Sequence, residues 1–148
     1  MIQTFKKSQK RVKKAFTLLE LLVVILILGL LAAFVVPNIV GAGDKAKRDL
    51  VCSQMGSIAN ALDMFQMDNG TLPETEEGLK ALVSNPDSDK YPSYSPKGYM
   101  KRVPKDSWGQ PIVYIKQGSN YELISYGADR KEGGTGNDAD ILYSQCNK

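Results

Sequence analysis

The longest run of apolar residues lies near the start of the chain, from Phe16 to Val36. Only Thr17, Glu20 and Gly29 interrupt it. A helix of this length reaches about 31 Å, which matches the thickness of the hydrocarbon core of a bilayer. The pattern therefore predicts a helix that spans a membrane.

Glu20 is an acid inside that apolar run. A carboxylate in a spanning helix costs about 2.5–3.5 kcal/mol on insertion scales, so an anchor alone would favour leucine at this position. We therefore expect Glu20 to meet a positive partner. The alternative is a tolerated acid near the helix end whose side chain extends to the headgroups.

A second pattern continues directly from the apolar run, over residues 38–68. Its apolar residues recur at alternating steps of four and three, which places them on one face of an α-helix: Val51, Met55, Ile58, Leu62 and Phe65. The two patterns predict one long helix that ends at Asn69-Gly70. Gly29 and Pro37 are its weakest points.

The rest of the chain predicts a small antiparallel sheet. A short helix over residues 75–83, with Thr75 as its N-cap, precedes a proline-rich connection over residues 85–111. Alternating strands at 112–116 and 121–125 then predict a hairpin, and 141–143 is a last apolar stretch. The expected fold class is α+β, a long N-terminal helix packed on the sheet. Its expected core is Leu50, Val51, Met55, Ile58, Leu62, Phe65, Leu79, Leu82, Val113, Ile115, Leu123 and Ile141.

Charge divides the chain into three parts. The 148 residues carry a net charge of +3, but residues 1–15 contain six lysines and arginines and no acid, so the chain from Phe16 onward carries −3. We expect 1–15 to be a cationic cytoplasmic leader, 16–37 a membrane helix and 38–148 a globular domain on the other side. The acidic body argues against binding to nucleic acid.

The sequence contains no histidine, which excludes His-based triads and His-ligated zinc. No other constellation of catalytic residues is visible, so we do not expect an enzyme. The two cysteines, Cys52 and Cys146, fit no metal-binding spacing. They can pair outside the cytoplasm, or remain as two buried thiols.

Residues 127–140 form a loop with four carboxylates and four glycines. Calcium binds six to eight oxygens, several of them anionic, on a flexible backbone. The acids do not have the spacing of an EF-hand. On composition alone, the loop is either a calcium site or a solvated turn.

Several motifs now form a recognisable set. Lys13-Lys14-Ala15 followed by Phe16-Thr17-Leu18-Leu19-Glu20 resembles the leader of type IV pilin-like proteins, which a prepilin peptidase cuts between the residues that match Ala15 and Phe16. That family usually has Gly in place of Ala15. The resemblance continues over nearly the whole chain and is greatest to the major pseudopilins of type II secretion systems. The motifs that carry it include Val36-Pro37-Asn38, Ala61–Phe65, Asp68-Asn69-Gly70, Pro73–Leu79, Gly98-Tyr99, Pro104–Gly109 and Gly127-Ala128-Asp129.

The resemblance implies a structural subunit of a periplasmic pseudopilus, a helical homopolymer that drives protein export across the outer membrane. Phe16 would become the N-methylated first residue, its amine would pair with Glu20, and the segment from Gly29 to Pro37 would unwind locally in the filament. The implied location is a single pass through the inner membrane, with the C-terminal domain in the periplasm. The implied partners are the membrane before assembly, minor pseudopilins, the inner-membrane assembly platform and the prepilin peptidase.

The resemblance also implies a structural Ca²⁺ in the acidic loop. The side chains of Asp129, Asp138 and Asp140 would bind it, with the carbonyls of Tyr126 and, more weakly, Tyr143. The chain departs from the family at Ser107, where Pro is common, and at Arg130, where Gly is frequent. Arg130 and Lys131 are cations that would weaken the site.

The alternative is a type IV pilin subunit for adhesion, motility or DNA uptake. Such pilins usually keep both cysteines near the C-terminus, whereas Cys52 lies on the predicted long helix. The position of Cys52 therefore favours a pseudopilin.

Overall fold

The computed structural model gives the backbone of residues 16–146 and the side chains of residues 16–33 and 43–146. The predicted leader, including Ala15 at its end, and the side chain of Pro37 lie outside the described residues. The elements are the helix α1 (Leu18–Asn69), the 3₁₀ helix η1 (Gly78–Leu82), the strands β1 (Val113–Gln117) and β2 (Asn120–Ser125), the 3₁₀ helix η2 (Gly136–Asp138), the strand β3 (Ile141–Leu142) and the 3₁₀ helix η3 (Tyr143–Gln145). The chain divides into two compact units, Met1–Val40 and Gly41–Lys148.

The long helix α1 has 52 residues, so the prediction of one continuous helix is confirmed. It ends at Asn69 because Gly70 takes a left-handed φ of 74° and donates its N–H to the carbonyl of Gln66 at 2.8 Å. Glycine adopts this conformation without the steric cost that a Cβ would add.

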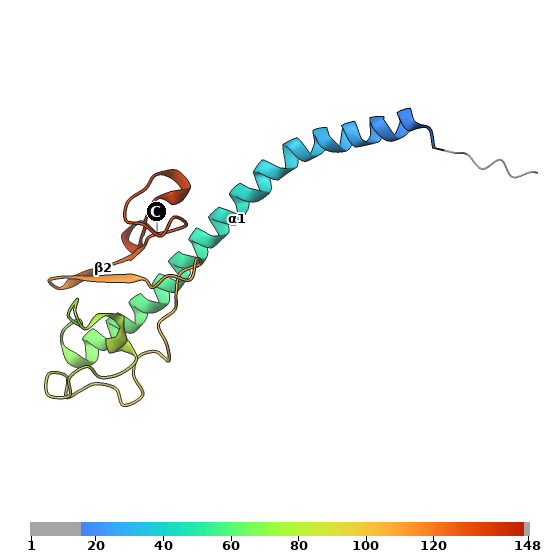
Figure 1. Cartoon of the computed structure of the whole chain (residues 1–148). Helices are drawn as coiled ribbons and strands as arrows, with labels where there is room; N and C mark the ends of the chain where they lie inside the picture. Colours follow the sequence, from blue (N-terminus) through green and yellow to red (C-terminus); the bar gives the residue numbers. More distant parts are fainter. Residues whose placement is uncertain (1–15, 147–148) are drawn as a thin grey trace, which may run out of the picture. The chain divides into compact units, whose positions relative to one another are not determined.

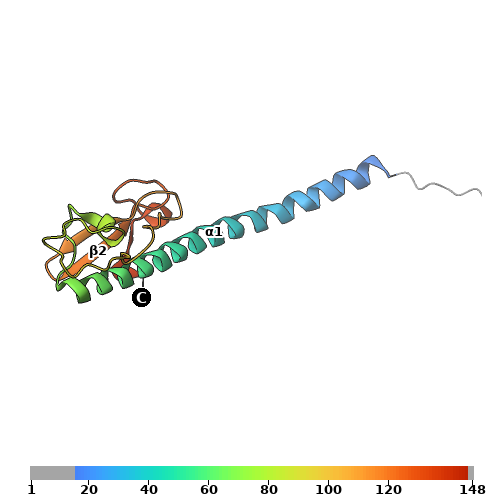
Figure 2. The same ribbon diagram turned by 90° about the horizontal axis from the view of Figure 1, so that it is seen from below.

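The sheet has three antiparallel strands in the order β1-β2-β3. A two-residue turn, Gly118-Ser119, joins β1 to β2. In both overall views β2 runs beside the C-terminal part of α1 (Figures 1 and 2). The α+β fold class predicted from the sequence is confirmed.

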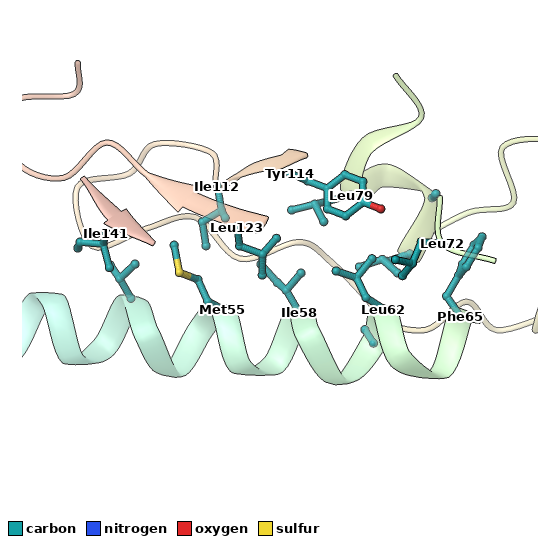
Figure 3. Packing of buried hydrophobic residues seen from close by; sticks show 14 of the residues in the cluster. Met55, Ile58, Leu62, Phe65, Leu72, Leu79, Ile112, Tyr114, Leu123 and Ile141 are labelled. Atoms are coloured by element: carbon teal, nitrogen blue, oxygen red, sulfur yellow. The ribbon is translucent and has the colours of Figure 1, made fainter. Parts of the chain in front are cut away.

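The core lies between α1 and the sheet. Met55, Ile58, Leu62 and Phe65 project from α1 toward residues of the layer that covers them (Figure 3). All four are fully buried. Full burial of such a side chain contributes roughly 1.5–3 kcal/mol, so this face of the helix is the main stabilising surface of the body.

Three residues expected in the core lie elsewhere. Leu50 is 53% exposed and Ile115 37% exposed, and Val113 is only partly buried. Tyr114 pairs with Leu123 and both are buried, so the alternation of a strand turns Val113 and Ile115 to the opposite face. Leu50 precedes the buried Val51 and therefore lies about 100° around the helix from it.

The helix predicted over residues 75–83 is shorter and of a different type. It is the 3₁₀ helix η1, which begins at Gly78. Thr75 does not cap it, because the Thr75 hydroxyl accepts the backbone N–H of Lys116 in β1 at 3.0 Å. Thr75 therefore joins this segment to the edge of the sheet.

Aromatic side chains hold the proline-rich connection on the end of α1. The ring of Phe65 lies 5.0 Å from that of Tyr91, 5.9 Å from that of Tyr94 and 5.3 Å from that of Tyr99. Such edge-on and tilted pairs contribute roughly 0.5–1.5 kcal/mol each beyond the area they bury. The irregular segment is thus packed on Phe65 without regular secondary structure.

Candidate functional site

The start of α1 is closed by a reciprocal pair of hydrogen bonds. The hydroxyl of Thr17 accepts the N–H of Glu20 at 3.2 Å, and the carboxylate of Glu20 accepts the N–H of Thr17 at 3.4 Å. This arrangement is a capping box, in which two N–H groups that lack helical partners are satisfied. Glu20 therefore has a local role in the structure that the sequence analysis did not include, although the spacing Thr-x-x-Glu is visible in the sequence.

The helical segment that follows exposes its apolar side chains. From Leu18 to Leu31 the large apolar residues are between 42% and 82% exposed. Within the described residues, no helix is long and apolar enough to cross a membrane. The predicted spanning segment extends to Val36, whose side chain lies outside the described residues, and it remains a prediction.

The acidic loop starts after β2 at Gly127, includes η2 and leads directly into β3. It is closed by two hydrogen bonds: the carboxylate of Asp140 accepts the N–H of Gly133 at 2.9 Å, and the N–H of Asp140 binds the Gly133 carbonyl at 3.1 Å. A Cβ on Gly134 would overlap the carbonyl oxygen of Asp138. The close approach at this position therefore requires glycine.

Asp129, Asp138 and Asp140, the predicted calcium ligands, all lie on this loop. Asp138 is exposed, and one oxygen of Asp129 accepts the N–H of Lys131 at 3.1 Å. The Oδ1 atom of Asp140 is buried and has no hydrogen-bond partner. Among the described residues, no three His, Cys, Asp or Glu side chains converge as a metal cluster.

The donor set nevertheless suits a hard cation in two respects. Its side chains supply oxygen only, and the buried, unpartnered oxygen of Asp140 is a carboxylate atom that a cation would satisfy. Tyr126 directly precedes the loop, and Tyr143 follows β3. The carbonyl of Tyr143 already accepts the N–H of Cys146 at 3.0 Å, and an ion would have to use its second lone pair.

Arg130 has a left-handed φ of 61°, the one positive φ outside glycine among residues 16–146. Its guanidinium donates to the carbonyl of Trp108 at 3.4 Å. The structure therefore explains why glycine suits this position, since a Cβ is disfavoured there.

Asp106 is a buried acid that the sequence analysis did not identify. One of its oxygens accepts the N–H groups of Trp108 at 3.0 Å and Gln110 at 2.8 Å, and the other accepts the hydroxyl of Ser125 at 2.7 Å. The hydroxyl of Ser125 in turn accepts the N–H of Gly127. Asp followed two residues later by Trp-Gly is typical of a turn closed by the Asp side chain, which is the signal available in the sequence.

The structure joins Cys52 of α1 and Cys146 in a disulfide, with their Cα atoms 5.5 Å apart and a sequence separation of 94. This bond attaches the end of the described chain to the C-terminal half of α1. Of the two arrangements that the sequence left open, the structure contains the bonded one.

The family model described as "Type II secretion system (T2SS), protein G" matches residues 38–144, and a prokaryotic N-terminal methylation motif matches residues 10–36. The chain belongs to the type II secretion system protein G family. The resemblance to major pseudopilins that the sequence motifs carry is thereby confirmed. The two matches together imply a membrane-anchored periplasmic subunit.

Individual relatives agree with the family match. The chain is 45% identical over 136 residues to core protein G of Pseudomonas aeruginosa, covering 90% of this chain and 96% of that protein. It is 44% identical over 136 residues to core protein G of Vibrio cholerae, covering 90% and 93%. The crystal structure of the major pseudopilin of enterohaemorrhagic Escherichia coli matches with a TM-score of 0.61 at 34% identity, covering 69% of this chain and 86% of that chain.

Proposed function

We propose how this chain, a structural subunit of type II secretion and a member of the protein G family, assembles. It is cut between Ala15 and Phe16, crosses the inner membrane once through residues 16–37, and polymerises through this helix into the periplasmic pseudopilus. In this scheme Phe16 carries the N-methylated amine. The growing filament drives protein export across the outer membrane.

One observation carries this proposal. The apolar side chains from Leu18 to Leu31 are exposed around α1. Exposed apolar surface of this extent favours removal from water, either into lipid or against other copies of the same helix. A helix that moves from lipid into the filament is shielded from water in both environments.

Glu20 is the charged residue of this surface, and it lies four residues after Phe16. A new amine on Phe16 would neutralise it, within one subunit or between neighbours, which lowers the cost of burying either charge. The capping contact between Glu20 and Thr17 offers a second explanation for the acid at this position. An experiment has to separate the two roles.

Three full-length variants separate them. Glu20→Gln keeps an acceptor that can complete a capping box but removes the charge, Glu20→Leu removes both, and Thr17→Ala removes the capping hydroxyl but keeps the charge. We expect filament yield, measured by shearing cells and immunoblotting the released fraction, to fall in both Glu20 variants and to persist in Thr17→Ala. Membrane insertion should be retained in all three. Filament yield at the wild-type level from Glu20→Gln would contradict the pairing of charges.

A deletion strain tests the cellular role. Deletion of the chain should abolish secretion of exported proteins and leave twitching motility intact. Loss of twitching with intact secretion would instead favour an adhesive or motility pilin.

We also propose that the acidic loop binds a structural Ca²⁺ through Asp129, Asp138 and Asp140, with the carbonyls of Tyr126 and Tyr143. The support is the buried, unpartnered oxygen of Asp140 together with a donor set composed of oxygen. When bound, the ion would offset two of the three negative charges of these carboxylates and hold the loop closed. It would thereby fix the entrance to β3.

A further inference from the structure

Three successive turns along one face of α1 hold the C-terminal segment of the chain. Asp44, Arg48 and Cys52 are spaced four residues apart, so they lie on the same side of the helix. They contact, in order, Asn137, Ala139 and Cys146. We call residues 137–146 the C-terminal strap.

The three contacts differ in kind. The carboxylate of Asp44 accepts the side-chain N–H of Asn137 at 3.2 Å on the surface. The guanidinium of Arg48 donates to the backbone carbonyl of Ala139 at 3.0 Å in a partly buried position. Cys52 forms the disulfide at the end of the strap. Between them, Ile141 is buried against the core.

The contact of Arg48 is placed where it affects the proposed ion site. Ala139 lies between Asp138 and Asp140, two of the three proposed ligands. A hydrogen bond that holds this carbonyl fixes the peptide plane between Ala139 and Asp140, and so restricts the backbone from which the Asp140 carboxylate extends and to which Asp138 is joined. Because Arg48 donates to a backbone carbonyl, it does not occupy the carboxylate oxygens that would bind the ion.

We propose that Arg48 is a positioning residue of the ion site, and that α1 is therefore part of that site although it supplies no ligand. This inference rests on the calcium site proposed above. The Cys52–Cys146 disulfide also holds the strap on α1, at the other end of the strap. Ion binding and the disulfide are then thermodynamically coupled.

Coupling of this kind is reciprocal. If the disulfide increases the affinity for calcium by some factor, calcium must shift the equilibrium between the reduced and the oxidised folded protein by the same factor. The reaction that reports it is ordinary exchange with a dithiol, in which the added thiol is oxidised to a disulfide while the Cys52–Cys146 bond is reduced to two thiols.

The first test measures calcium affinity of the full-length protein in detergent by titration calorimetry. We expect Arg48→Leu to raise the Kd about tenfold, the lower end of what is seen when groups that orient metal ligands are removed. Arg48→Lys, which can still donate to the Ala139 carbonyl, should recover part of the affinity. Lys45→Leu removes an exposed cation from the preceding turn and should leave the Kd unchanged. Equal Kd values for the wild type and Arg48→Leu would overturn the proposal.

A second measurement works without the ion. Hydrogen exchange in EGTA should be faster at the amides of residues 138–142 in Arg48→Leu than in Lys45→Leu, with exchange at Ile58 and Leu62 unchanged in both. Equal exchange in the strap would overturn the role of Arg48, whatever the outcome with calcium. If the wild type bound no calcium but Arg48→Leu still exchanged faster than Lys45→Leu at residues 138–142, the ion site and the ligand-positioning role would be rejected. Only the attachment of the strap by Arg48 would then stand.

The coupling has its own test. Titration with a dithiol in calcium and in EGTA should give a more stable disulfide in calcium, by the same factor by which the double variant Cys52→Ser, Cys146→Ser raises the calcium Kd. Identical reduction curves in the two buffers would overturn the coupling.

Discussion

The hydroxyl of Ser125 donates a 2.7 Å hydrogen bond to the carboxylate of Asp106, and both side chains are buried. Ser125 is the last residue of β2, and its hydroxyl also accepts the N–H of Gly127, where the acidic loop begins. The carboxylate of Asp106 also holds the turn that contains Trp108. One buried acid thus joins that turn to the start of the loop.

The first prediction concerns this acid. Asp106→Ala leaves two N–H groups and a hydroxyl without their acceptor, and each hydrogen bond to a charged group contributes roughly 1.5–3 kcal/mol, with losses that do not add fully. We expect the free energy of unfolding, measured in urea, to fall by about 3 kcal/mol or more. Asp49→Ala, at an exposed acid of α1, should change it by less than about 0.5 kcal/mol. Similar unfolding curves for the two variants would show that Asp106 is dispensable.

The second prediction concerns acid pH. Burial acts to raise the pKa of the Glu77 carboxyl, but hydrogen bonds from Lys90, Tyr91 and the N–H of Glu74 outweigh it, so the pKa lies below its ordinary value of 4.5. A lowered pKa in the folded state stabilises the protein above the unfolded-state pKa. This contribution is lost as the pH falls below about 4.5 and through the folded-state pKa.

The measurement is urea unfolding at pH 7 and at pH 3. We expect Glu77→Gln to reduce stability at pH 7 and to show a smaller further loss at pH 3 than the wild type does. Glu76→Gln, at an exposed neighbouring acid, should follow the wild type at both values. If the difference between pH 7 and pH 3 were the same in Glu77→Gln and in the wild type, Glu77 would not be a source of the acid sensitivity.

The third prediction concerns calcium. An ion at a hundred times its Kd that binds only the folded state stabilises it by about 2.7 kcal/mol. For a body of this size we expect the Tm to rise by about 10–20 °C between EGTA and calcium. Magnesium should substitute poorly, because it requires a tighter octahedral site and releases its waters reluctantly.

Two variants locate the effect. Asp140→Asn removes the charge of a proposed ligand while leaving an oxygen that can accept the Gly133 N–H, and it should remove most of the rise in Tm. Glu132→Gln, at an exposed acid of the same loop, should keep it. A rise in Tm that survives Asp140→Asn would move the ion elsewhere, and no rise in the wild type would leave the loop a solvated turn.

The fourth prediction concerns Arg130. Left-handed backbone costs a residue with a Cβ roughly 1–2 kcal/mol, whereas glycine adopts it freely but loses more entropy on folding. We expect Arg130→Gly to raise the free energy of unfolding in EGTA by up to about 1 kcal/mol and to tighten calcium binding, because a cation is removed from the loop. Lys131→Gly makes the same charge change without the positive φ, so it should tighten binding without raising stability in EGTA. Lower stability of Arg130→Gly would show that the contact with Trp108 outweighs the backbone cost.

Much of the fold could be predicted because it depends on local periodicity. Spacing and turn residues that are close together in the sequence predict the hairpin and the end of α1 before Gly70. They also predict the buried face of α1, which consists of Met55, Ile58, Leu62 and Phe65. The errors at Val113 and Ile115 have a different origin. In β1 the aliphatic Val113 and Ile115 share one face, and Tyr114 shares the other with Lys116, so the sequence favours the wrong face. In the structure the buried Tyr114 faces the core.

The acidic loop could be located from composition, but not its attachments. The contacts of Arg48 with Ala139 and of Ser125 with Asp106 join segments that are 91 and 19 positions apart. A single sequence carries no signal for such pairs, because Arg48, Asp106 and Ser125 are ordinary polar residues at their own positions and Ala139 takes part through its backbone carbonyl. Thr75 shows the same difficulty: it has the residue type of an N-cap, but its hydroxyl is used by a strand 41 positions away.

The Cys52–Cys146 bond makes a closed covalent ring that includes the hairpin, the acidic loop and the proline-rich connection. Residues 85–90 of that connection are exposed, so they are accessible to a protease. A single cut there opens the ring but leaves both fragments joined through sulfur. A nicked subunit would therefore run as one species on a non-reducing gel and as two after reduction, and it would stay tethered to α1.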